Sequence, residues 1–195
     1  IFPQISINWL ELEEIKNGQL LTAIKAIEYF SLKGKILIHN CDTSYKISQN
    51  FEEIDEQFFG AIPYFFSEGE NWSFVKTYEG KELISEVQEK KRISSKCSVG
   101  TYFFRESEEL IKLTKKYLLS IDKNSNQELY ISPVYDYAIK QGKNILALKA
   151  SHVKTFGTLE EICSSFNLSC NEIKGENGFS GHQRKTLVVD IDKTI

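Results

Sequence analysis

The stretch Lys35-Ile36-Leu37-Ile38-His39-Asn40-Cys41-Asp42-Thr43 decides the fold class. Its first five residues form a compact, mostly apolar run, which is typical of a β-strand covered on both faces. A polar turn carrying Asp42 follows at once. Loops at the carboxyl ends of strands line the ligand crevice in open α/β sheets. The stretch therefore predicts an α/β domain with Asp42 at its binding edge.

Helical and strand patterns alternate on both sides of this stretch. Upstream, apolar residues recur at helical spacing from Leu20 to Phe30, and Gly34 ends this helix before the strand begins. Downstream, short β-like runs alternate with helical runs, as in layered α/β domains. The expected strands are 61–66, 73–77, 83–87, 99–104, 145–148 and 186–189, and the expected helices are 107–119, 133–141 and 159–166.

The composition is that of an ordinary globular domain. Of the 195 residues, 41 % are hydrophobic and 26 % are charged, which argues against disorder and collagen. No apolar run approaches the roughly 20 residues that cross a bilayer, and the start lacks the pattern of a signal peptide. The net charge of −3 gives no reason to expect a nucleic-acid partner. We therefore expect a cytoplasmic protein without membrane insertion.

Both ends of the sequence suggest a piece of a longer polypeptide. The sequence begins with Ile1, contains no Met, and ends at Ile195 just after an apolar run. Residues 174–185 are rich in Gly, Asn and Ser, which predicts a linker. We accordingly expect a main domain over 1–173, a linker over 174–185, and the first strand of a second unit over 186–195.

One single residue and one pair of residues next to the expected strands are candidates for ligand binding. Asp42 could hold Mg²⁺, which takes one or two protein carboxylates plus substrate phosphates, or it could simply form a turn. Glu89 and Lys90 could bind a sugar hydroxyl and a phosphate, or they could belong to a solvated charge cluster with Lys91 and Arg92.

A weaker candidate lies at the start of the first helix. The Gln19 amide offers donors and an acceptor for a base edge, and Gly18 would let a ligand approach closely.

The end of the sequence carries a separate acidic motif. An apolar run leads into Asp190 and Asp192, with Thr194 two residues further on. Alternate residues of a strand point the same way, so both carboxylates could share one Mg²⁺. Asp190 could then attack phosphorus, Asp192 could act as acid or base, and Thr194 could bind phosphate. A chance acidic turn after a strand is the other interpretation.

Taken in order, several segments resemble the sugar-phosphate nucleotidyltransferase family over roughly residues 10–166. The matching stretches are Asn17–Ala23 (NGQLLTA), Ile36–Thr43 (ILIHNCDT), Trp72–Val75 (WSFV), Ile84–Lys91 (ISEVQEKK), Ser98–Phe104 (SVGTYFF), Ser132–Tyr135 (SPVY) and Phe156–Glu161 (FGTLEE). The resemblance implies a three-layer αβα fold with a mostly parallel mixed central sheet. It also implies transfer of a nucleotidyl group from a nucleoside triphosphate to a sugar 1-phosphate or similar phosphorylated alcohol, with release of pyrophosphate, for surface-polysaccharide or glycoconjugate precursors.

The resemblance also implies roles for individual residues. Gly18 and Gln19 would face the nucleobase, and Asp42 would hold Mg²⁺ against the nucleotide phosphates. Glu89 and Lys90 would bind the sugar and its phosphate, and Gly100 would leave room for the sugar. Catalysis would then depend on Asp42 and Lys90.

The sequence departs from the family pattern in two places. The family's Gly-rich loop with its Arg and Lys has no counterpart here, so we expect a domain incomplete at its N-terminus and inactive by itself. Thr155 stands where many relatives carry a second metal-binding Asp. A non-catalytic module that binds a nucleotide sugar is therefore a second hypothesis.

Asp190 to Thr194 resembles the first motif of haloacid-dehalogenase-type phosphatases, with Lys193 where Gly is commoner. This resemblance implies a fused phosphatase-like domain in which Asp190 would be catalytic and Asp190 and Asp192 would hold Mg²⁺. A third hypothesis places the main activity, removal of phosphate from a sugar phosphate, in that domain.

Overall fold

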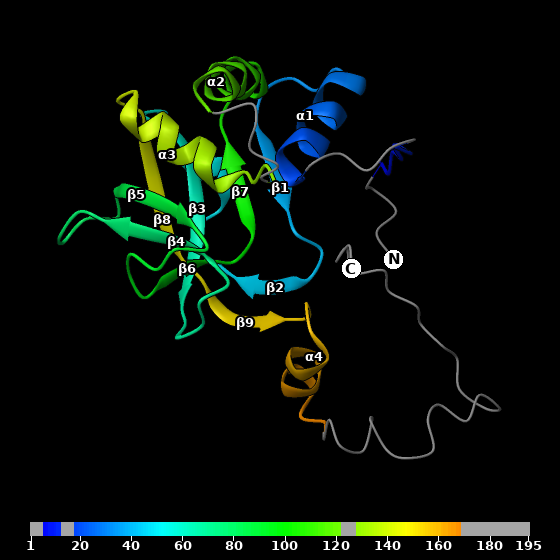
Figure 1. Ribbon diagram of the computed structural model, residues 1–195, viewed down its shortest axis with the longest axis vertical. Coiled ribbons are helices and arrows are strands. Elements are labelled where there is room, and N and C mark those ends of the chain that lie inside the picture. Colours follow the sequence, from blue (N-terminus) through cyan, green and yellow to red (C-terminus); the bar gives the residue numbers. More distant parts are fainter. Residues whose placement is uncertain (1–5, 13–17, 122–127, 169–195) are drawn as a thin grey trace.

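A computed structural model describes residues 6–12, 18–121 and 128–168 and shows a mixed α/β fold (Figure 1). The central sheet has seven strands in the order β1-β7-β3-β6-β4-β5, and β8 pairs with β3 beside this path. Its strands are β1 (Ile36–His39), β3 (Phe58–Phe66), β4 (Ser73–Thr77), β5 (Ile84–Glu89), β6 (Lys96–Ser98), β7 (Thr101–Phe104) and β8 (Asn144–Lys149). A second, two-stranded sheet pairs β2 (Thr43–Lys46) with β9 (Ser151–Thr155).

The central sheet is mostly antiparallel, so the expectation of a mostly parallel sheet is wrong. Parallel pairing needs a long crossover, usually a helix, and no α-helix separates the strands between Phe58 and Phe104. These strands pair antiparallel through short connections, as β4 and β5 do around Tyr78–Lys81. The described ladders contain one parallel pair, β3 with β8, where two helices provide the crossover.

Three helices cover one face of the sheet (Figure 1). They are α1 (Gln19–Tyr29), α2 (Ser107–Ser120) and α3 (Ser132–Lys140). Strand residues alternate between faces, so Tyr102 and Phe104 pack toward the helices while Phe103 points the other way. Phe103 packs against Phe51 and Ile54, which belong to the short 3₁₀ helix Phe51–Glu53 and its C-terminal cap between β2 and β3. Among the described residues, α1, α2 and α3 therefore cover one face of the sheet, and the short 3₁₀ helix Phe51–Glu53 lies on the other.

Most helices and strands lie close to their expected positions, with two instructive differences. The expected strand over 99–104 is interrupted at Gly100, whose φ of 75° separates β6 from β7 along the chain. Leu37 in β1 is 50 % exposed, so this strand is not covered on both faces as its apolar sequence suggests. Its place at one end of the strand order accounts for the exposure.

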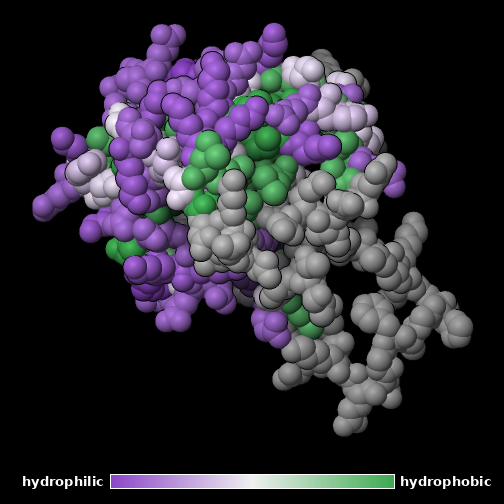
Figure 2. All heavy atoms as spheres, turned by 45° about the horizontal axis from the view of Figure 1, so that its top comes forward, coloured by the Kyte–Doolittle hydropathy of each residue, from purple (hydrophilic) through white to green (hydrophobic). Residues whose placement is uncertain are grey.

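The fourth helix, α4 (Leu159–Phe166), follows the small sheet and begins with the capping pattern expected from Thr158. No helix in the described parts of the chain is long and apolar enough to cross a membrane. Figure 2 shows mainly hydrophilic residues over the helical side, interrupted by an apolar area.

Candidate functional site

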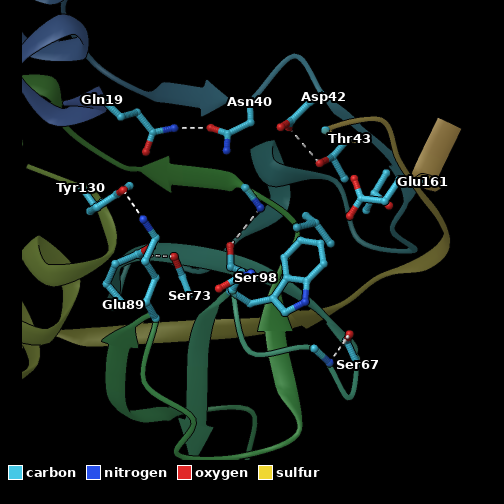
Figure 3. A pocket seen from close by; sticks show the side chains of 18 of the residues that line it. Gln19, Asn40, Asp42, Thr43, Ser67, Ser73, Glu89, Ser98, Tyr130 and Glu161 are labelled. Carbon is cyan, nitrogen blue, oxygen red and sulfur yellow. Dashed lines mark hydrogen bonds between the residues drawn. The ribbon is translucent and has the colours of Figure 1, made fainter. Parts of the chain in front are cut away.

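A cleft of about 610 Å³ opens where the central sheet meets the small sheet (Figure 3). The residues that line it come from the start of α1, from the ends of β1, β5 and β9, from the β3–β4 loop, and from the start of α4. They are Gln19, Asn40, Asp42, Thr43, Ser67, Gly69, Glu70, Asn71, Trp72, Ser73, Glu89, Lys90, Ser98, Val99, Gly100, Tyr102, Tyr130, Thr155, Gly157, Thr158 and Glu161. Asp42 and the Glu89–Lys90 couple thus border one cavity, although 47 positions separate Asp42 from Glu89.

Asp42 is placed by the small sheet. It lies in the turn between β1 and β2, where its backbone C=O accepts from the Phe156 N–H at 2.8 Å. The Thr43 hydroxyl donates to Asp42 Oδ1 at 3.2 Å, and Thr43 pairs with Thr155 of β9. This pairing brings the end of β9 and the following Gly157 beside the carboxylate.

Glu161 completes an acidic group at this end of the cleft. A Cβ atom on Gly157 would lie 3.2 Å from Glu161 Oε2 and 3.3 Å from Asp42 Oδ2, so both carboxylates face the space that glycine leaves open. Glu161 also belongs to a capping box: its Oε2 accepts from the Thr158 N–H at 3.2 Å, and its own N–H donates to Thr158 Oγ1 at 3.2 Å. Sequence reasoning missed Glu161 as a cleft residue, and the available signal was an acid three residues after the helix cap.

These oxygens fit the ligand preference of Mg²⁺, because hard cations take carboxylate oxygens and substrate phosphates. No group of three or more His, Cys, Asp or Glu side chains gathers around a common point in the described ranges. Thr155, which stands where the family resemblance implies a second metal-binding Asp, lines the same cleft. Asp42 and Glu161 are therefore the residues here that could hold a divalent cation.

Glu89 anchors the opposite end of the cleft. It is the last residue of β5 and pairs with Ser73 of β4. The Ser73 and Ser132 hydroxyls both donate to Glu89 Oε2, the latter at 2.6 Å. The Tyr102 hydroxyl lies 3.2 Å from Ser73 Oγ, and burial raises the pKa of Tyr102 to about 12, so its phenol stays protonated.

Lys90 is held at the rim by an aromatic partner. Its φ of 54° is left-handed, which turns the chain sharply after β5, and its N–H donates to the Trp72 C=O at 2.9 Å. Its ammonium donates to the Tyr130 hydroxyl and lies 4.5 Å from the ring centroid. Tyr130 in turn donates to Glu128. The hydrogen bond that Lys90 donates to Tyr130 raises the pKa of Lys90, so the side chain is a cation at neutral pH.

Arg92, the last residue of the basic run after Glu89, has a structural position instead. Its guanidinium donates to the C=O groups of Gly69 at 2.6 Å and Ser67 at 3.2 Å, and it lies 5.2 Å from the Phe74 ring centroid. Arg92 therefore fastens the β3–β4 loop that forms one wall of the cleft.

Gln19 and Asn40 point toward each other in the cleft (Figure 3), and Gly100 lies against the Asn40 side chain. Gln19 Nε2 donates to Asn40 Oδ1. At Gly100 a Cβ would lie 2.8 Å from Asn40 Nδ2, so the glycine makes room for the Asn40 amide. Gly18 is not among the lining residues; its φ is 109°, and a Cβ there would lie 2.4 Å from the Leu129 backbone N. Close packing against Leu129 explains this glycine without a ligand.

The candidates at the end of the sequence lie outside the described residues. These are the linker over 174–185 and the motif residues Asp190, Asp192 and Thr194. The phosphatase-like second unit and its roles stay predictions.

The fold is that of known sugar nucleotidyltransferases. The nucleoside-diphosphate-sugar pyrophosphorylase from Vibrio cholerae RC9 superposes with a TM-score of 0.70 at 26 % identity, over 80 % of this chain and 67 % of that one. A putative glucose-1-phosphate thymidylyltransferase from Bacillus anthracis, solved in complex with a sucrose, superposes with a TM-score of 0.59 at 18 % identity, over 78 % of this chain and 61 % of that one. No family model matches the sequence, and no curated protein matches it either.

Proposed function

We propose that this chain is the sugar-phosphate-binding part of a sugar-phosphate nucleotidyltransferase that makes an activated precursor for surface polysaccharides or glycoconjugates. The observation that carries the proposal is the shared cleft, with carboxylates at the Asp42 end and an anchored acid–base couple, Glu89 and Lys90, at the other. The likeness to two sugar nucleotidyltransferase structures supports the same class of reaction.

The proposed reaction is an in-line displacement at phosphorus. An oxygen of the sugar 1-phosphate attacks the α-phosphorus of the nucleoside triphosphate and forms a new P–O bond. The bond from the α-phosphorus to the bridging oxygen breaks, and pyrophosphate leaves with the electron pair. Such reactions depend mainly on positioning and charge neutralisation.

The charged and amide side chains of the cleft each have a role in the proposed reaction. Asp42 and Glu161 would hold a divalent cation, and Mg²⁺ bound there would supply positive charge for the nucleotide phosphates. The Lys90 ammonium attracts the sugar phosphate, and Glu89 accepts from sugar hydroxyls. Gln19 donates one amide hydrogen to Asn40. Its carbonyl oxygen and its second N–H can therefore bind the edge of a nucleobase.

Pyrophosphate release by the full-length protein tests the activity. Nucleoside triphosphates are combined with a panel of sugar 1-phosphates in the presence of Mg²⁺, and we expect at least one pair to release pyrophosphate. Asp42→Ala should abolish release, whereas Cys41→Ala at the exposed neighbouring position should not. Silence across the panel would rule out the activity, and full turnover by Asp42→Ala would remove Asp42 from the site.

Thr155 favours a second candidate, a module that binds a nucleotide sugar without turning it over. The family resemblance implies an Asp at this position in many relatives, whereas the Thr155 side chain offers no anionic ligand in the cleft. Calorimetry with UDP-, GDP-, CDP- and dTDP-sugars would then show binding by full-length protein that never releases pyrophosphate. Release of pyrophosphate by the same preparation excludes this second candidate.

A further inference from the structure

One oxygen of the Glu89 carboxylate, Oε2, accepts two hydrogen bonds from the protein itself. Ser73, the first residue of β4, and Ser132, the first residue of α3, both donate a hydroxyl hydrogen to Glu89 Oε2. Ser132 is fully buried, and Glu89 is partly exposed at the edge of the cleft. The carboxylate is thus fixed from two directions, by a strand and by a helix.

The directions of these hydrogen bonds follow from the chemistry of the partners. An ionised carboxylate has only acceptors, so both serines donate to it. The Ser73 oxygen can then accept from Tyr102, which lies 3.2 Å away and keeps its proton. The result is a chain from Tyr102 through Ser73 to Glu89, joined there by Ser132.

We propose that Ser73 and Ser132 are positioning residues that hold Glu89 Oε2 and leave Oε1 to accept a hydrogen bond from the ligand. A carboxylate held in this way selects a ligand that carries a donor, and the neighbouring Lys90 selects an anionic group. The ligand class is therefore a phosphorylated polyol or sugar with a free hydroxyl. This inference rests on the proposed function and narrows its substrate.

Substitution of both serines tests the positioning role. In the full-length protein, Ser73→Ala with Ser132→Ala should raise the KM for the best sugar 1-phosphate of the panel by about tenfold or more, because hydrogen bonds to a charged group are the stronger kind. The KM for the nucleotide should stay within about twofold. The single variant Ser73→Thr keeps a hydroxyl beside Glu89, so its KM for the sugar phosphate should lie close to that of the wild type.

A matched control separates positioning from general destabilisation. Ser107 is also a fully buried serine, and its hydroxyl donates to the Leu32 C=O at 2.8 Å on the helical side of the molecule. Ser107→Ala should lower the melting temperature without changing either KM. Equal KM values for the sugar phosphate in the wild type and in the double variant would overturn the proposal.

A structural measurement decides the positioning role without turnover. Crystal structures of the wild type and of the double variant should show Glu89 in one conformer in the first and in several in the second. An unmoved Glu89 in the double variant overturns the positioning role. If the wild type turns over no substrate but Glu89 adopts several conformers in the double variant, the proposed activity is wrong. The positioning of Glu89 by the two serines then still holds.

Discussion

The two ends of the cleft hold their charged groups in different ways. At the Glu89–Lys90 end, each charged side chain has a neutral protein partner: serine hydroxyls bind Glu89 and a phenol binds Lys90. At the other end, the Asp42 and Glu161 carboxylates face the same space beside Gly157, and no ion pair among the described residues connects either to a Lys or Arg.

Both ends contain hydrogen bonds made within the protein, since Asp42 accepts from Thr43 and Glu161 accepts from Thr158. The difference is that the Glu89–Lys90 end combines an acid with a base, whereas the other end combines two acids. Hydrogen bonds that are already made cost nothing when a ligand arrives, so the Glu89–Lys90 end is prepared for binding. Two neighbouring carboxylates repel each other until a cation joins them. Affinity at the Asp42 end should therefore depend on what is supplied from solution, and at the Glu89 end on what the fold has fixed.

The largest expected effect comes from Gly100→Ala, at the junction of the two ends. A φ of 75° and a Cβ position 2.8 Å from Asn40 Nδ2 make any side chain unfavourable there. The backbone conformation alone costs about 1–3 kcal/mol, and displacement of Asn40 from Gln19 adds about 1 kcal/mol more. Urea unfolding of the wild type and of Gly100→Ala measures the loss in the free energy of unfolding.

Gly80→Ala is the matched control for this prediction. Gly80 has a similar φ of 65°, but a Cβ there meets nothing within 4 Å. It should therefore show the backbone cost without the contact cost. Equal losses for the two substitutions would mean that the Asn40 contact does not stabilise the junction.

The next largest effect is a gain at the Asp42 end. Thr155→Asp would add a third carboxylate to the side of the cleft that carries Asp42 and Glu161. Since ligand charge tunes the affinity for hard cations, Mn²⁺, used as a spectroscopic probe, should bind on the order of tenfold more tightly. Electron paramagnetic resonance of free Mn²⁺ measures the change. Thr155→Asn has a similar shape without the charge; if it binds Mn²⁺ as tightly as Thr155→Asp, the carboxylate reading of this end is wrong.

The sequence predicts the helices and strands of this fold better than the way they pair. Apolar spacing places α1, β4 and α4 within a residue of their observed bounds. Pairing partners leave no trace in that spacing, which is why the antiparallel sheet was missed. The strands β2 and β9 were also missed, because they are short and largely exposed and so lack an apolar pattern.

The candidate site divides in the same way. Asp42, Glu89 and Lys90 carry charge next to strand ends, and they can be selected from sequence alone. Glu161 reaches the cleft only because the β2–β9 pairing brings Gly157 to Asp42, a tertiary contact that no local pattern records. Ser73 and Ser132 carry no charge, and 59 positions separate them, so their shared contact with Glu89 needs the folded chain.

The smallest expected effect tests the prepared end through Tyr130→Phe. The Tyr130 hydroxyl is the main cause of the raised pKa of Lys90, so its removal should lower that pKa toward the ordinary lysine value of 10.5. The aromatic ring remains beside the ammonium, and Lys90 is exposed, so the loss of stability should be below about 1 kcal/mol. A raised folded-state pKa stabilises fully below the unfolded value, and this contribution is lost as the pH rises through the folded value. The stability gap between wild type and Tyr130→Phe should therefore be present at pH 8 and shrink in strongly alkaline solution.

Nuclear magnetic resonance titration of the lysine Cε–Hε signals measures the pKa of Lys90, with neighbouring Lys91 as internal control. An unchanged Lys90 titration would show that the phenol does not hold the ammonium, and the two ends of the cleft would then differ only in their carboxylates.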